Sequence, residues 1–188
     1  MEGKLIIISG PSGAGKGTIL SAFKDNEELN LHFSVSATTR KARPGEVDGK
    51  DYFFLEPDDF KQRVENGEFL EHEDFHSASY GTLRSQVEKQ LSEGENVLFD
   101  IDVNGAMNIK QIYGKRALSI FIMPPSLEEL RQRLIGRGTE SIEKIEERLS
   151  RAEYEMSFSD KFDETIVNDN LEVAQVEAEG LIEDFLSE

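Results

Sequence analysis

Residues 4–18 read Lys4-Leu-Ile-Ile-Ile-Ser-Gly10-Pro-Ser-Gly13-Ala-Gly15-Lys16-Gly17-Thr18, and this stretch decides the fold. Residues 5–8 form an unbroken apolar run, which is typical of a strand buried on both faces of a parallel sheet. The spacing from Gly10 to Gly15-Lys16 is that of a phosphate-binding loop. Glycines let successive backbone N–H groups approach a polyphosphate closely, and the helix that follows adds partial positive charge. We therefore predict a nucleotide site here, rather than an ordinary glycine-rich turn.

The lysine of this loop provides a mobile full charge that can follow a transferring phosphoryl group. The usual pattern places Ser or Thr directly after the lysine, where the hydroxyl contacts Mg²⁺. In this chain Gly17 comes between Lys16 and Thr18. Two arrangements stay open: Thr18 contacts the ion from one position further along, or the ion is held through water and phosphate oxygens.

Length and composition exclude several classes of protein. The chain has 188 residues, which fits one domain with inserted lobes, and it has no cysteine for a disulfide or a cysteine metal site. We expect a cytoplasmic protein without a membrane partner, because no apolar run could span a bilayer and no signal peptide precedes the first strand. The formal net charge of −17 argues against a broad surface for nucleic acid. An anionic substrate therefore requires local clusters of arginine and lysine.

Two such clusters occur. Arg40 and Arg43 lie between turn signals, and we interpret them as a phosphate clamp because guanidinium groups bind phosphate in bidentate fashion. A solvated basic loop would have the same composition. The second cluster surrounds a Gly-Arg-Gly-Thr hinge between two predicted helices, which favours a lid over a phosphate chain. The alternative is a helical hairpin whose arginines pair with glutamates. The residues of this second cluster are Arg131, Arg133, Arg137, Arg148 and Arg151.

Another apolar strand, predicted from residue 96, ends in two carboxylates. Asp100 and Asp102 would share a face at the carboxyl end of the strand, where ligands of open α/β sheets bind. A strand-end aspartate commonly orders Mg²⁺ or its waters in phosphate-loop enzymes. The alternative is the N-cap of a helix predicted at residues 104–112.

The order of the predicted elements specifies the fold class. Strands alternate with helices along the chain, which predicts an α/β fold with a mainly parallel sheet, right-handed crossovers and helices on both faces. Residues 34–80 are poorer in helix and are expected to form a small lobe. A phosphate loop, a basic clamp, an arginine lid and strand-end acids together indicate phosphoryl transfer from a nucleoside triphosphate to a small phosphorylated acceptor.

From about residue 3 to residue 185 the chain resembles guanylate kinase. The motifs are Gly10-Pro-Ser-Gly-Ala-Gly-Lys16, Phe33-Ser-Val-Ser36-Ala-Thr-Thr-Arg40-Lys-Ala-Arg43-Pro-Gly-Glu46-Val-Asp-Gly49-Lys-Asp-Tyr52-Phe-Phe54, Tyr80-Gly81-Thr82, Asp100-Ile-Asp102, Pro124-Pro125-Ser126, Arg137-Gly-Thr-Glu140 and Val167-Asn168-Asp169. The resemblance implies one domain with a three-layer P-loop core at residues 1–33, 83–124 and 157–188. It also implies a GMP-binding lobe at residues 34–82 and a helical lid at residues 125–156. The implied reaction converts ATP and GMP to ADP and GDP with Mg²⁺, and dGMP is a second acceptor.

The resemblance also implies a role for individual residues. The positive groups that stabilise the transferring phosphoryl group would be Lys16, Arg43, Arg137 and Arg148. ATP would be bound by Gly10, Pro11, Ser12, Gly13, Ala14, Gly15, Lys16, Gly17 and Thr18, with Asn168 near the adenine. The GMP phosphate would be held by Arg40, Arg43, Tyr52 and Tyr80. The guanine would be read by Ser36, Glu71 and Thr82, with Asp102 as a second acid near the base. Asp100 would act on Mg²⁺ through water.

Two other interpretations stay open. The Gly-Lys-Gly-Thr sequence also permits another nucleoside-monophosphate kinase such as an adenylate kinase, although the block at residues 36–52 argues against it. A guanylate-kinase-like scaffold domain would bind phosphopeptides without chemistry, but Lys16 and the lid arginines argue for an enzyme. The sequence does not determine the oligomeric state.

Overall fold

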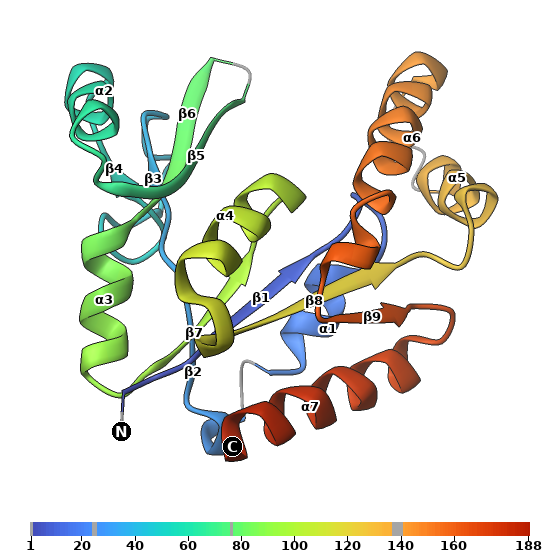
Figure 1. The fold of residues 1–188 in the computed structure, drawn as a ribbon. Helices are drawn as coiled ribbons and strands as arrows, with labels where there is room; N and C mark the ends of the chain where they lie inside the picture. Colours follow the sequence, from blue (N-terminus) through green and yellow to red (C-terminus); the bar gives the residue numbers. More distant parts are fainter. Residues whose placement is uncertain (1, 24–25, 76, 137–140) are drawn as a thin grey trace. The chain divides into compact units, whose positions relative to one another are not determined.

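A computed structural model of the chain describes residues 2–23, 26–75, 77–136 and 141–188 (Figure 1). The chain separates into two compact units. The smaller unit comprises residues 32–98 together with the N-terminal segment up to Lys4, and the larger comprises residues 5–31 and 99–188. None of the helices that the structure describes is long and apolar enough to cross a membrane.

The parallel sheet is built around the predicted N-terminal strand. β1 (Leu5–Ser9) is completely buried and pairs in parallel with β8 (Ala117–Met123), which pairs in parallel with β9 (Glu164–Val167). With β2 (Leu31–Phe33) and β7 (Asn96–Asp100), the strand order is β2-β7-β1-β8-β9. Apolar side chains on both faces explain why these runs are continuous rather than alternating. The predicted mainly parallel α/β fold is confirmed.

Helices connect and follow these strands in the larger unit. They are α1 (Lys16–Ser21), α4 (Val103–Tyr113), α5 (Leu127–Gly136), α6 (Ile142–Met156) and α7 (Leu171–Ser187), with 3₁₀ turns at Glu27–Leu29, Gly114–Arg116 and Ser159–Lys161. The Ser126 hydroxyl accepts a hydrogen bond from the Glu129 N–H at 3.0 Å, so Ser126 caps α5. Ser141 likewise caps α6.

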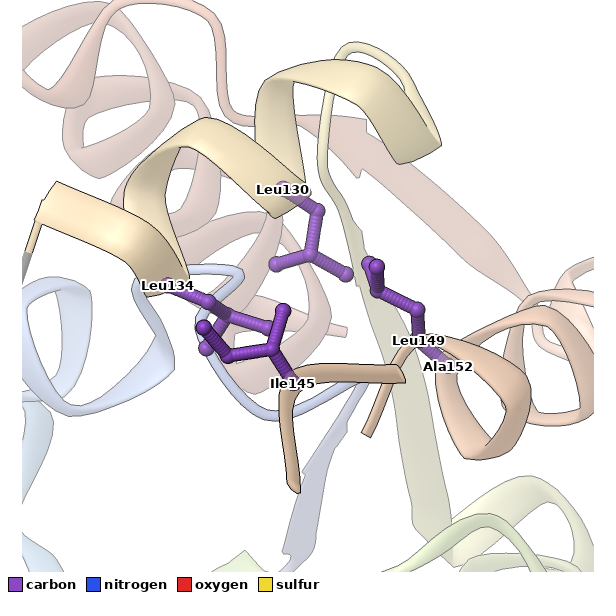
Figure 2. Packing of buried hydrophobic residues seen from close by; sticks show 5 residues of the cluster. All are labelled: Leu130, Leu134, Ile145, Leu149 and Ala152. Atoms are coloured by element: carbon purple, nitrogen blue, oxygen red, sulfur yellow. The ribbon is translucent and has the colours of Figure 1, made fainter. Parts of the chain in front are cut away.

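The two helices of the predicted lid pack against each other through aliphatic side chains. Figure 2 shows side chains of α5 and α6 directed toward one another in one buried cluster. Its members are Leu130, Leu134, Ile145, Leu149 and Ala152. The apolar stripe of α6 is buried in the middle of the helix, whereas Ile142 at its start is 74% exposed. A hydrophobic residue in the first turn of a helix has no core to face when no neighbouring element covers that turn.

The smaller unit contains a second, four-stranded sheet in the order β4-β3-β6-β5. Its strands are β3 (Ala37–Thr38), β4 (Phe53–Phe54), β5 (Phe69–Phe75) and β6 (Ala78–Leu83), and its helices are α2 (Pro57–Glu65) and α3 (Arg84–Ser92). Ala37, Phe60, Phe69 and Leu83 form its core. Residues 34–36 lie between β2, which ends at Phe33, and β3, which begins at Ala37.

Candidate functional site

The phosphate-loop segment runs between β1 and α1 and requires glycine for two reasons. Gly10 and Gly15 have φ angles of 142° and 94°, which L side chains rarely adopt. A Cβ atom on Gly10 would lie 2.2 Å from the Ile122 carbonyl oxygen of β8, so only glycine lets the loop pass this strand. A Cβ atom on Gly13 would lie 2.8 Å from a methyl carbon of Leu130 on α5. The glycines therefore satisfy packing within the protein as well as the close approach to phosphate that the sequence suggested.

Lys16 begins α1, and its side chain folds back over the loop. Its Nζ atom donates hydrogen bonds to the carbonyl oxygens of Gly10 at 2.6 Å and Pro11 at 3.3 Å. Burial lowers the pKa of Lys16, and the negative charges of Asp100 and Glu155 oppose this shift. These carbonyls are neutral acceptors that a phosphate oxygen can replace, so the charge of the lysine is available to an anion at the loop.

Gly17 and Thr18 follow Lys16, where the common phosphate-loop pattern has Ser or Thr directly after the lysine. Gly17 and Thr18 are exposed in the first turn of α1, and a Cβ atom on Gly17 would meet nothing within 4 Å. The described residues thus give no packing reason for glycine at this position.

The two strand-end carboxylates have different surroundings. Surrounding protein raises the pKa of Asp100, and the charge of Lys16 opposes this. Asp100 lies at the exposed carboxyl end of β7. The Oδ1 atom of Asp102 accepts hydrogen bonds from the N–H groups of Asn104 at 2.7 Å and Gly105 at 3.2 Å, so Asp102 is the N-cap of α4. The capping alternative is therefore correct for Asp102.

A charged group that the sequence interpretation missed lies near Lys16. Glu155 of α6 is only 8% exposed, accepts a hydrogen bond from Arg151 Nε at 3.0 Å, and acts electrostatically on Lys16. The signal that could have identified it is its position three residues after Ala152, on the buried stripe of an otherwise amphipathic helix.

Asn168, expected near adenine, follows β9 and is 5% exposed. Its Nδ2 atom donates a hydrogen bond to the Ala14 carbonyl oxygen of the phosphate loop at 2.8 Å. No base-contacting role follows from this geometry, so contact with adenine stays a prediction.

In the smaller unit, Arg40 is held by a carboxylate and by aromatic rings. Its Nη1 and Nη2 atoms each donate to Glu46 at 2.9 Å, and its guanidinium carbon lies 5.2 Å from the ring centroid of Tyr52. The hydrogen bonds that Arg40 donates to Glu46 raise the pKa of Arg40, and Tyr80 adds to this shift. The hydrogen bond from Arg40 and the backbone N–H of Arg43 lower the pKa of Glu46 to about 2. Arg40, Tyr52 and Tyr80 are thus brought together, while Arg43 is exposed beside Glu46.

The second part of this unit is a buried carboxylate on the adjoining strands. Glu71 of β5 is 9% exposed, and its Oε1 atom accepts a hydrogen bond from Thr82 Oγ1 of β6 at 2.6 Å. Ser36 is half-buried directly before β3, and its carbonyl oxygen accepts a hydrogen bond from Phe53 N–H at 2.9 Å. Glu71 and Thr82 therefore form one polar pair before any ligand is considered.

The arginines of the predicted lid separate into different groups. Arg131 forms an ion pair with Glu146 through two hydrogen bonds, so the alternative of a helical hairpin with paired arginines holds for Arg131. Arg133 donates hydrogen bonds to Glu129 and to the Asn168 carbonyl oxygen. Arg148 is half-buried on α6. The prediction for Arg137 and its hinge falls outside the residues that the structure describes.

Comparisons with known proteins give a consistent result. A model of the guanylate kinase family matches residues 2–185. A guanylate kinase of Bacteroides thetaiotaomicron is 56% identical over 188 residues, covering 100% of this chain and 92% of its own. One of Bacteroides fragilis is 55% identical over 186 residues, covering 98% and 91%. The crystal structure of guanylate kinase from Anaplasma phagocytophilum has a TM-score of 0.72 and 32% identity, covering 100% of this chain and 88% of that one.

Proposed function

The chain belongs to the guanylate kinase family, and from this premise we propose that it transfers the γ-phosphoryl group of ATP to GMP. The observation that carries the proposal is the buried Glu71–Thr82 pair in the same unit as the Arg40 clamp. A carboxylate accepts hydrogen bonds but does not donate them, so it suits the adjacent N–H groups of guanine. Adenine does not offer the same pattern of donors.

The acceptor nucleotide is assigned to the smaller unit. Arg40, Arg43, Tyr52 and Tyr80 bind the phosphate of GMP, because guanidinium and phenol groups donate hydrogen bonds to its oxygens. Ser36, Glu71 and Thr82 read the guanine edge. Asp102 belongs to the larger unit, where its Oδ1 atom caps α4, and is proposed as a second acid for the base. Since these roles concern the phosphate and the base rather than the 2′-hydroxyl, dGMP is a second acceptor.

The donor nucleotide is assigned to the larger unit. Residues 10–18 bind the polyphosphate of ATP, and Asn168 contributes to the ATP site. Lys16 exchanges its carbonyl acceptors for oxygens of the transferred group, where charge develops in the transition state. Arg43, Arg137 and Arg148 provide the other positive groups. These arginines come from the proposed GMP-binding lobe at residues 34–82 and the proposed lid at residues 125–156, whereas Lys16 belongs to the core.

Magnesium is proposed to enter with ATP. The donor set fits this ion, because Mg²⁺ takes one or two carboxylates together with phosphate oxygens and water, and Asp100 supplies a carboxylate near Lys16. Asp100 would hold the ion through water, and the Thr18 hydroxyl is a second candidate. When bound, the ion neutralises charge on the phosphates. We further propose that the enzyme acts in the cytoplasm.

The proposal is tested by measuring ADP release from Mg·ATP with GMP, AMP, CMP and UMP offered in parallel. Turnover with GMP and not with the other three is the expected result. Preference for AMP would retain the phosphate loop and reject the assignments of Glu71 and Thr82. Binding of GMP without turnover of any acceptor would instead support a non-catalytic binding domain.

A further inference from the structure

We infer that Asn168 is a positioning residue that braces the phosphate loop, so that its carboxamide acts on the polyphosphate through the loop backbone. The inference rests on the proposed function insofar as it takes residues 10–18 to bind a polyphosphate. It starts from one hydrogen bond, between Asn168 Nδ2 and the Ala14 carbonyl oxygen, across 154 positions of sequence.

The bond determines the direction of a backbone donor. The Ala14 carbonyl and the Gly15 N–H belong to the same planar trans peptide and point in opposite directions. A side chain that holds the carbonyl oxygen from one side therefore directs the Gly15 N–H toward the other. Among the described residues the Gly15 N–H donates no hydrogen bond, as expected for a donor that serves a ligand.

The fit between the two segments is tight. A Cβ atom on Gly15 would lie 2.3 Å from Asn168 Nδ2, so the amide occupies the space that a side chain at Gly15 would need. Ala14 is completely buried, which leaves its carbonyl oxygen little access to solvent when the amide is absent.

Asn168 is itself fixed by neighbouring backbone and side-chain groups. Its N–H donates to the Met123 carbonyl oxygen at 2.8 Å, at the end of β8. Its own carbonyl oxygen accepts a hydrogen bond from Arg133 Nη2 of α5 at 3.1 Å. The backbone of Asn168 is thus fixed through both its N–H and its carbonyl group. A side chain on a fixed backbone can hold the Ala14 carbonyl in one position.

The experiment distinguishes two roles for Asn168, which are positioning the phosphate loop and contacting the adenine base. In Asn168→Asp the Nδ2 donor becomes an oxygen that repels the Ala14 carbonyl, with almost no change of shape. We expect the KM for ATP and the KM for GTP to rise by about the same factor, roughly tenfold or more. The dissociation constant of inorganic tripolyphosphate, which has no base, should rise by that factor too when it is measured by calorimetry. The KM for GMP at saturating ATP should be unchanged.

Selective loss of ATP relative to GTP, with tripolyphosphate binding unchanged, would show that Asn168 reads adenine and would overturn the inference. Unchanged constants for all three ligands would overturn it as well. Asn170→Ala is the matched control, because Asn170 caps α7 through its side chain and should affect stability alone. If Asn168→Asp does not fold, Asn168→Ser removes the bond without adding charge and is tested in the same way.

The experiment distinguishes this inference from the proposed function. Binding of tripolyphosphate is measured by calorimetry without GMP. If the Asn168 variants bind it normally, the inference fails, but GMP-dependent turnover of the unaltered chain still supports the proposed function. A chain that transferred no phosphate to GMP would still report on the brace through tripolyphosphate.

Discussion

Glu46 holds both terminal nitrogens of Arg40, with Nη1–Oε2 and Nη2–Oε1 distances of 2.9 Å each. Nη1 also donates to the Lys41 carbonyl oxygen at 2.9 Å. Three N–H groups of the guanidinium are thus used, two by Glu46 and one by Lys41, and Tyr80 is a further hydrogen-bond partner of Arg40. The same carboxylate accepts the Arg43 N–H at 2.7 Å, so it orders both arginines of the clamp.

Glu46→Gln should therefore weaken GMP binding. The amide loses one of the two acceptors that fix Arg40, so we expect the KM for GMP to rise roughly tenfold while the KM for ATP is unchanged. Steady-state kinetics with each substrate varied in turn measures both constants. Glu65→Gln, at an exposed position of α2, is the control. A clamp that kept its GMP affinity without the carboxylate would show that Glu46 does not position Arg40.

Lys16→Met should remove turnover and retain acceptor binding. Because the ammonium acts mainly where charge develops in the transition state, kcat should fall by about 100-fold or more. The affinity for GMP, measured by calorimetry, should remain measurable. Lys115→Met removes an exposed lysine from the same unit and should leave kcat unaffected. Near-normal turnover of the Lys16 variant would reject the phosphate-loop assignment.

Glu71→Gln should reduce recognition of guanine. The amide presents a donor where the carboxylate accepted, and the lost pairing in a buried position should cost on the order of 2 kcal/mol of GMP binding. Calorimetric titration with GMP measures this loss. Glu73→Gln, two residues along the same strand at an exposed position, serves as the comparison. Equal GMP affinity in the Glu71 variant and the unaltered chain would remove Glu71 from the site.

Asp163→Asn should lower the stability of the larger unit. Asp163 Oδ2 accepts hydrogen bonds from Ser119 N at 2.8 Å and Ser119 Oγ at 2.7 Å, and it pairs with Lys110 Nζ at 2.7 Å. Because solvent reaches the pair, we expect a loss of roughly 1 kcal/mol in the free energy of unfolding. Urea denaturation at neutral pH measures it, with exposed Asp160→Asn as control.

The stability difference between the unaltered chain and Asp163→Asn should depend on pH. Desolvation alone would raise the pKa of Asp163, but the bonds from Lys110 and Ser119 outweigh it and lower the pKa. A carboxyl with a depressed pKa stabilises the fold above its unfolded pKa of about 3.9 and loses that contribution as the pH falls through the folded pKa. The stability difference between the two proteins should therefore be full at neutral pH and shrink below about pH 4. A difference that stayed constant into acid would contradict this account.

Local sequence predicted those parts of the fold that depend on neighbouring residues. The buried run of β1 depends on a pattern within a few positions, and the structure confirms it. The Ser126 cap and the start of α2 at Pro57 also rest on signals within a few positions. The two-residue strands β3 and β4 are too short to show any period, and their pairing is decided by distant partners, so they were missed.

The candidate site divides in the same way. The glycines and Lys16 could be identified because their spacing along the chain carries the signal. The bond from Asn168 to Ala14 and the charge of Glu155 near Lys16 could not, because each depends on how separate segments fold together. Glu46 was visible as a motif residue, but its hold on Arg40 depends on the path of an irregular loop.

The bond between Asn168 and Ala14 has a consequence for protein engineering. Residues 4–18 contain every position of the recognisable motif, yet the group that supports Ala14 is supplied by the segment after β9. A fragment that ended before β9, or a foreign scaffold into which the motif was grafted, would carry the signature without its support. The phosphate loop of this protein is therefore not a portable module, and a working transplant would have to include an amide donor at the end of a neighbouring strand.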